Sequence, residues 1–341
     1  MVEFLERLGM GFRTDQWIVR ADGVVRNAHV FHEDDPAWMR EVEDKTRPWL
    51  GFVHPRFAEI HSISWARDTL VIVTGDERGQ LLTRAAKHLT DPAEREAWAV
   101  AEAIAIANTV AAMTNHQPGF VHERVYDQVF VGADGHARLR APIAYVQAYK
   151  PGTYLGRGNS LGSIYGMAPE QARGLRVTPA TDVFGLATLL YTAIALRRPF
   201  EGANDSDFER LQAIVDAKQP RPPSNSLATW SVLKRALAKE PAERYPTPAA
   251  FADALYTAAG QTAPPSALAK LAALHPRTGP APNESVGIIG WRCTKRWESL
   301  KPTESEGVRY CGECKHDVVE VTSLQAVIPL LGKRCIAYRP E

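Results

Sequence analysis

Hydrophobic residues alternate in short runs over the first 75 residues and recur at helical spacing further along the chain. Residues 17–20 (WIVR), 23–31 and 69–73 (TLVIV) predict strands, with a turn at Asp22-Gly23 and a helix over residues 36–45. The later pattern predicts a small hairpin around Asp134-Gly135 and five helices, over residues 91–113, 183–196, 207–217, 230–238 and 248–258. A β-rich first lobe followed by a helical second lobe is typical of an α+β fold.

Composition narrows the class of protein. Of the 341 residues, 45% are hydrophobic and 23% are charged, which is the ordinary globular range. Lys+Arg (40) and Asp+Glu (39) nearly balance, so a dedicated nucleic-acid-binding protein is not favoured. Glu3 and Glu6 stand where an export signal would need positive charge. The apolar run at residues 183–196 is too short to cross a bilayer. We therefore expect a cytoplasmic protein that does not contact membranes.

A proline-rich stretch divides the chain. Residues 260–286 contain five prolines, a density that breaks regular structure and stiffens a linker. Within this stretch, residues 266–274 could still form a short helix. We accordingly expect a large domain over residues 1–259, a linker over 260–286, and a small C-terminal module over 287–341.

All four cysteines lie in that module, as Cys293, Cys311, Cys314 and Cys335. The Cys-x2-Cys pair with one distant cysteine on each side predicts a closed tetrahedral thiolate site for one structural zinc ion. The pattern is similar to small bacterial zinc-ribbon-like modules. Four reduced, buried cysteines are the alternative, and disulfides are disfavoured without an export signal. His316 is a substitute ligand that four cysteines would make unnecessary.

Three separated blocks carry a family resemblance. Residues 162–170 read GSIYGMAPE, Asp182 opens an apolar helix, and residues 233–255 read LKRALAKEPAERYPTPAAFADAL. In this order and spacing they resemble the C-terminal lobe of bacterial serine/threonine protein kinases. The resemblance implies a bilobal protein-kinase-like fold, with an N-lobe over about 1–75 and a C-lobe over about 76–259.

The resemblance also implies structural roles for three charged residues. Glu170, the acid of Ala-Pro-Glu, is expected to pair with Arg244. Asp182 is expected to brace the backbone of the catalytic loop. These roles concern the fold and leave the chemistry open.

The positions that would carry that chemistry depart from the kinase pattern. The catalytic loop falls at residues 119–129 (GFVHERVYDQV), where His122 matches the pattern. Arg124 stands at the position of the catalytic Asp, and Val129 at that of the magnesium-binding Asn. Ala141 stands at the position of the second magnesium carboxylate. An ion pair between Arg124 and Glu123 would give these replacements a structural role.

The N-lobe departs from the pattern as well. Residues 7–14 (RLGMGFRT) resemble a degraded Gly-rich loop, in which Gly9 and Gly11 are vestigial nucleotide-binding positions. His29 falls where the phosphate-binding Lys of the third strand would be. Glu41 or Glu43 could be the helix acid that normally orients that Lys.

Each of these replacements would weaken phosphoryl transfer. Magnesium needs hard oxygen ligands, and a positioned general base contributes roughly 10²–10⁴ in rate, whereas a guanidinium accepts no proton. We interpret the large domain as a pseudokinase that does not use ATP and magnesium and that binds a protein partner as a regulator or scaffold. The alternative is an atypical serine/threonine kinase, or another nucleotide-dependent transferase, that uses non-standard residues.

Other features weigh less in the functional interpretation. Nucleic-acid binding through the cysteine module is a third and weakly supported hypothesis. Three tryptophans, Trp38, Trp49 and Trp65, are candidate partner anchors, although small-lobe aromatic residues more often belong to the core.

Overall fold

The computed structural model describes fourteen stretches of the chain, namely residues 2–10, 14–31, 36–66, 69–143, 164–201, 207–216, 220–224, 226–259, 262–274, 287–289, 300–305, 307–312, 316–321 and 335–338. The chain divides into two compact units. The first comprises Met1–Gly51, Glu59–Asp76 and Arg277–Glu341, and the second comprises Phe52–Ala58 and Glu77–Pro276. Each unit is described by itself below.

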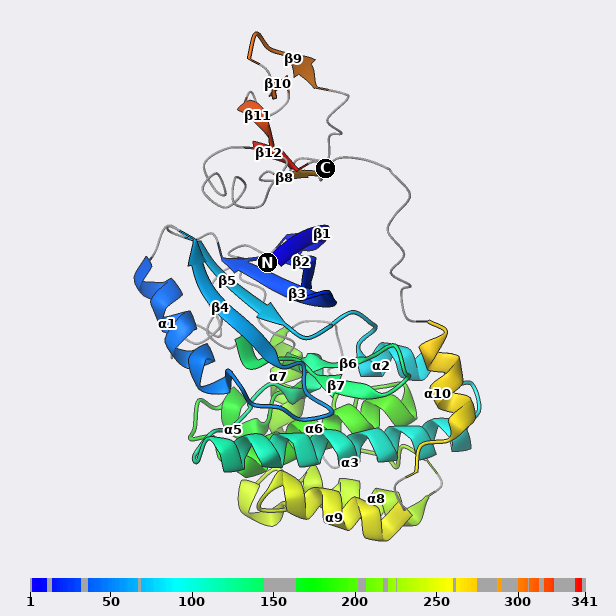
Figure 1. The fold of residues 1–341 in the computed structure, drawn as a ribbon. Helices are drawn as coiled ribbons and strands as arrows, with labels where there is room; N and C mark the ends of the chain where they lie inside the picture. Colours follow the sequence, from blue (N-terminus) through cyan, green and yellow to red (C-terminus); the bar gives the residue numbers. More distant parts are fainter. Residues whose placement is uncertain are drawn as a thin grey trace. The chain divides into compact units, whose positions relative to one another are not determined.

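The first unit is built on a five-stranded antiparallel sheet, drawn in blue in Figure 1. Strands β2 and β3 are joined by the predicted two-residue turn, where Asp22 (φ 51°) and Gly23 (φ 77°) both take left-handed conformations that suit a tight hairpin. The strand order is β1-β2-β3-β5-β4, with bounds β1 Val2–Met10, β2 Thr14–Ala21, β3 Val24–Phe31, β4 Ile60–Ala66 and β5 Thr69–Thr74.

Helix α1 (Pro36–Thr46) follows β3 and packs on this sheet. Its Trp38 ring lies 5.9 Å from that of Phe31, and Met39 and Val42 are fully buried. The predicted helix is therefore confirmed. Trp49, in the short η1 (Arg47–Trp49), is also buried. Trp38 and Trp49 thus belong to the core, and the suggestion that they are exposed partner anchors is wrong.

Two apolar helices organise the second unit (Figure 1). In α3 (Pro92–His116), Asp91 caps the first turn by accepting a hydrogen bond from Ala93 N. Helix α6 (Pro179–Ala195) packs against α3, and most of its side chains are buried. The remaining elements are α2 Leu82–Ala85, η2 Ala86–His88, α4 Val125–Gln128, β6 Val129–Val131, β7 Ala137–Leu139, η4 Ile164–Gly166, α5 Pro169–Ala172, α7 Asp207–Asp216, α8 Leu227–Ala236, η5 Pro241–Glu243 and α9 Pro248–Ala259.

Helix α3 is also the one helix, within the described stretches, that is long and apolar enough to cross a membrane. Its most apolar window is 67% buried in the protein, as the core helix of a globular unit would be. Helix α9 packs along it.

A further helix, α10 (Pro265–Ala272), lies inside the proline-rich stretch, where a short helix was expected. It packs on α3 through Ala267 and Leu271, which are fully buried. Lys270 Nζ lies 2.6 Å from Glu94 Oε2, and Ser266 donates a hydrogen bond to the same carboxylate. Gly135 allows this contact, since a Cβ there would lie 2.3 Å from the Leu268 carbonyl oxygen.

The C-terminal module forms a second five-stranded sheet. Strand β11 lies in its middle, paired in parallel with β12 and antiparallel with β10. The strand order is β8-β12-β11-β10-β9, with bounds β8 Gly287–Ile289, β9 Lys301–Pro302, β10 Val308–Cys311, β11 His316–Val321 and β12 Cys335–Tyr338.

Candidate functional site

The loop expected to be catalytic is held by Asp182. This residue lies in the first turn of α6, which begins at Pro179, four residues before the predicted range of 183–196. Its two carboxylate oxygens accept hydrogen bonds from the backbone N–H groups of His122 (2.8 Å) and Glu123 (2.7 Å). Glu123 has φ of 64°, so the loop turns sharply at the point where Asp182 grips it. The expected bracing role of Asp182 thus has a direct geometric basis.

Burial shifts the pKa values of Asp182 and His122. Burial raises the pKa of Asp182 to about 7, although the two backbone hydrogen bonds act in the opposite direction. Burial, reinforced by the charge of Arg124, lowers the pKa of His122 to about 3. His122 is therefore a neutral, packed core histidine at neutral pH.

Arg124, at the position of the catalytic Asp, binds a different acid from the one expected. Its Nη2 lies 2.8 Å from Asp127 Oδ2, one turn further along α4, so the predicted pair with Glu123 is wrong. Glu123 is instead held through its backbone, because its carbonyl oxygen accepts a hydrogen bond from Gln171 Nε2 at 3.0 Å. A guanidinium in this ion pair cannot act as a general base.

The two positions that the kinase resemblance assigns to magnesium binding carry apolar side chains. Val129 opens β6 and is 0% exposed, and Ala141, just after β7, is 4% exposed. The predicted hairpin is confirmed, with Val129 paired with Leu139. Neither side chain offers an oxygen to a hard cation.

Glu170 and Arg244 form a buried ion pair, as the resemblance implies. Arg244 Nη1 and Nη2 each lie 2.8 Å from one oxygen of Glu170, a bidentate geometry in which both side chains are almost fully buried. Burial raises the pKa of Glu170, but the hydrogen bonds and charge of Arg244 outweigh it, so that the pKa lies below its usual value. Further hydrogen bonds join Arg244 to the carbonyl oxygens of Ala180, Ala238 and Lys239, and Thr181 Oγ1 to Glu170.

In the first unit, two of the expected nucleotide-contacting positions, His29 and Gly9, lie in strands of the sheet. His29 is buried in the middle of β3, between Gln16 of β2 and Ile72 of β5. Gly9 lies in β1, opposite Gln16, whereas Gly11 lies outside the described residues.

Both candidate orienting acids of α1 have partners of their own. Lys45 Nζ lies 2.7 Å from Glu41 Oε1. Glu43 accepts a hydrogen bond from Trp65 Nε1 at 2.5 Å and pairs with Arg47.

The structure describes the backbone of two of the four cysteines, Cys311 and Cys335. Cys311 pairs with His316 and Cys335 with Val318, so their backbones flank β11 two residues apart along that strand. Cys293 and Cys314 lie outside the described residues. The side chains that the structure does describe form no group of three or more potential metal ligands.

Comparison with curated proteins finds bacterial protein kinases, although no family model matches the chain. The tyrosine-protein kinase MasK of Myxococcus xanthus is 42% identical over 95 residues, which are 27% of this chain and 14% of MasK. The serine/threonine-protein kinase PknA of Mycobacterium tuberculosis is 25% identical over 237 residues, which are 68% of this chain and 54% of PknA. The chain thus spans about half or less of the length of these relatives.

Comparison with solved structures finds the fold of a bacterial kinase domain. The crystal structure of the Mycobacterium tuberculosis PknI kinase domain has a TM-score of 0.52 and 21% identity, covering 76% of this chain and 96% of that domain. The expected protein-kinase-like fold, with a β-sheet N-terminal part and a helical part, is therefore confirmed. The relatives support a relationship to bacterial serine/threonine protein kinases.

Two contacts of the site escaped the sequence analysis. The pair of Arg124 with Asp127 has an i,i+3 spacing, but a four-residue helix leaves no periodic pattern that would announce it. Tyr126, at the position of a kinase lysine, packs against Gly166, where a Cβ would lie 2.1 Å from Tyr126 Cβ. The glycine in the 162–170 block was the available signal for this close packing.

Proposed function

We propose that this chain is a pseudokinase, a kinase-like domain that regulates or scaffolds a protein partner and does not transfer phosphate. The observation that carries the proposal is the ion pair of Arg124 with Asp127 at the position of the general base. The base, the metal ligands and the phosphate-binding lysine are replaced together, by Arg124, Val129, Ala141 and His29. Phosphoryl transfer depends almost entirely on positioning and electrostatic stabilisation, so these replacements remove most of what the site would supply.

The second candidate is an atypical kinase or another nucleotide-dependent transferase. It is favoured by the relatives, which are themselves named as protein kinases. Asp127, the carboxylate that pairs with Arg124, would be the candidate base, and this candidate would require Arg124 to release it. The two candidates differ in one observable, which is whether nucleotide and divalent metal bind to the wild-type chain and react.

Metal-dependent nucleotide binding and phosphate transfer are the decisive measurements. The purified full chain is titrated with ATP, with and without Mg²⁺ or Mn²⁺, by calorimetry and thermal shift, and phosphate incorporation is followed with labelled ATP. PknA is the positive control, and an Asp127→Asn variant, which lacks the carboxylate that the second candidate would use, is the matched negative control. A ligand at a hundredfold excess over its Kd would stabilise the fold by about 2.7 kcal/mol.

For a pseudokinase we expect no metal-dependent shift, and incorporation equal to that of the Asp127→Asn variant. Metal-dependent binding with incorporation above that background would overturn the proposal and favour the transferase. Nucleotide binding without metal and without transfer would make the kinase-like domain a nucleotide sensor within the same regulatory function.

The same proposal includes a structural zinc ion, a protein partner and a cellular location. Cys293, Cys311, Cys314 and Cys335 would hold one structural Zn²⁺, which a zinc-to-protein ratio of about one by elemental analysis would support. The partner would be a protein, and nucleic-acid binding is not favoured by the nearly neutral net charge. The location would be cytoplasmic.

A further inference from the structure

The N-terminal sheet is apolar on both faces. Every residue of β5 (TLVIVT) is buried, although side chains along a strand point alternately to opposite faces. An antiparallel sheet that has one face in water shows buried and exposed residues in alternation. Both faces of this sheet are therefore withdrawn from water along β5, and each needs a cover there.

Helix α1 covers one face. Phe31 of β3 contacts Trp38 of α1, and alternation along β3 places His29 on the same face as Phe31. Ala28 and Val30, at the intervening positions, belong to the opposite face. We call that opposite face the outer sheet face, and its residues are Phe4, Trp17, Val19, Ala21, Ala28, Val30, Val71 and Val73.

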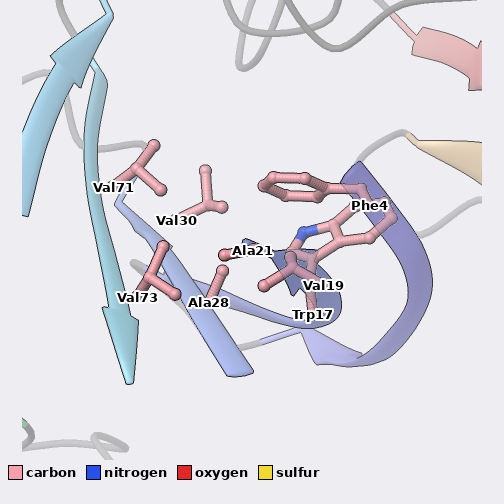
Figure 2. Packing of buried hydrophobic residues seen from close by; sticks show 8 residues of the cluster. All are labelled: Phe4, Trp17, Val19, Ala21, Ala28, Val30, Val71 and Val73. Carbon is pink, nitrogen blue, oxygen red and sulfur yellow. The ribbon is translucent and has the colours of Figure 1, made fainter. Parts of the chain in front are cut away.

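The outer sheet face forms a single apolar cluster (Figure 2). Phe4 and Trp17 lie at one end with ring centroids 5.3 Å apart, where two register shifts bend β1. Val19 and Ala28 are 0% exposed and Val73 is 1% exposed. A valine on the open face of a sheet would keep much of its surface in water, so this burial requires packing from above.

Two partly buried side chains supply that packing, Val2 from β1 and Val319 from β11. Val319 belongs to the C-terminal module, which falls in the same compact unit as the sheet. More than 240 residues separate it in sequence from the last cluster residue, Val73. The one contact with the cluster that comes from a distant part of the chain is thus made by the module, among the residues that the structure describes.

We propose that the C-terminal module docks through β11 on the outer sheet face and serves as an intramolecular cap of the kinase-like N-lobe. The module is then a part of the fold's own core, and a partner could reach the outer sheet face only after displacing it. This inference does not depend on whether the domain transfers phosphate, because neither the cluster nor β11 includes a catalytic position.

The first test places a photo-crosslinking amino acid at position 319 of the full chain. We expect intramolecular crosslinks to peptides that contain cluster residues, within residues 2–10, 14–31 or 69–74. The same probe at exposed Asp317, on the same strand, is the matched control and should give far fewer of these crosslinks. Crosslinks of the 319 probe only to other regions, or only between two copies of the chain, would overturn the proposal.

The second test measures side-chain exposure by hydroxyl-radical footprinting. Val319→Asp places a charge against an apolar cluster, so labelling of Trp17 should rise severalfold, and a chain ending at residue 276 should show the same rise. Asp317→Asn should leave Trp17 labelling unchanged. Wild-type protection of Trp17 in the shortened chain would overturn the cap, because the module would then cover nothing.

Discussion

Two sets of residues in the helical part compare differently with the kinase pattern: the buried charged residues match it, and the positions expected to be catalytic do not. Glu170, Arg244 and Asp182 have the residue types and contacts that the kinase resemblance implies, down to a bidentate ion pair with two 2.8 Å bonds. Arg124 and Val129 belong to the loop that Asp182 holds, and they stand where the kinase pattern predicts an aspartate and an asparagine. The difference teaches that the kinase scaffold can be specified separately from its active site.

Burial explains why the two sets are separable. An anchor such as Arg244 is a charge inside the protein, and the loss of its partner leaves that charge uncompensated. A catalytic position needs its carboxylate or amide only when a metal and phosphates must be bound. Val129 and Ala141 instead lie in the apolar core, where they are 0% and 4% exposed.

The largest test of this comparison breaks the buried ion pair. Glu170→Ala should lower the free energy of unfolding by about 3–5 kcal/mol, because Arg244 would remain buried without a counter-charge. Denaturant unfolding followed by circular dichroism measures the change. The control is Glu3→Ala, which removes an exposed ion pair with Arg20 and should cost about 0–1 kcal/mol. A double variant, Glu170→Ala/Arg244→Met, should be more stable than the single one, and equal losses would argue against the ion pair as the cause.

A second test concerns the pH dependence of the Asp182 grip. Its pKa is about 7 in the folded chain and 3.8 for the ordinary side chain. Between these values the folded chain holds a proton that the unfolded chain has released, so the contribution of Asp182 to stability falls as pH rises from 3.8 to about 7.

Asp182→Asn should therefore cost about 1–3 kcal/mol, from a weakened buried hydrogen-bond acceptor, and more at pH 4 than at pH 7. Unfolding curves of the two proteins across this range check the sign, and titration of His122 cancels in their difference. A cost that grows with pH would show that the His122 and Glu123 amides keep the carboxylate charged.

The smallest effect is expected at the catalytic position itself. Arg124→Ala removes an ion pair in which both side chains are about one-fifth exposed, and it should change stability by only about 0–1 kcal/mol. Asp127→Asn is the matched variant, and the two changes together should cost no more than either alone. A loss as large as that of Glu170→Ala would make Arg124 an architectural residue and would erase the contrast.

Strong periodicity made most of the fold predictable. Helices such as α3, α7 and α9, the β6–β7 hairpin and the turn at Asp22-Gly23 lie within a few residues of their expected places. Strands β1 and β4 were not individually predicted. Glu3, Glu6 and Arg7 interrupt the apolar pattern of β1, and its pairing with β2 depends on bulges that no local rule anticipates.

The candidate site divides in the same way. The contacts of Glu170, Arg244 and Asp182 followed from spaced motifs whose geometry the fold fixes. The partner of Arg124 depended on which acid a single helical turn presents, and the role of Val319 depended on a contact between distant strands. Neither contact leaves a local signature in the sequence.

The docking of α10 on α3 has a consequence for competition between partners. Only fourteen residues separate Ala272, the end of α10, from Gly287, where the module begins. Even fully extended, a segment of this length reaches about 50 Å, so a module released from the outer sheet face would remain confined to the volume around α10. Tethers of this kind set local concentrations on the order of millimolar, and a rival ligand present at micromolar concentration would have to bind the outer sheet face roughly a thousandfold more tightly than the module does.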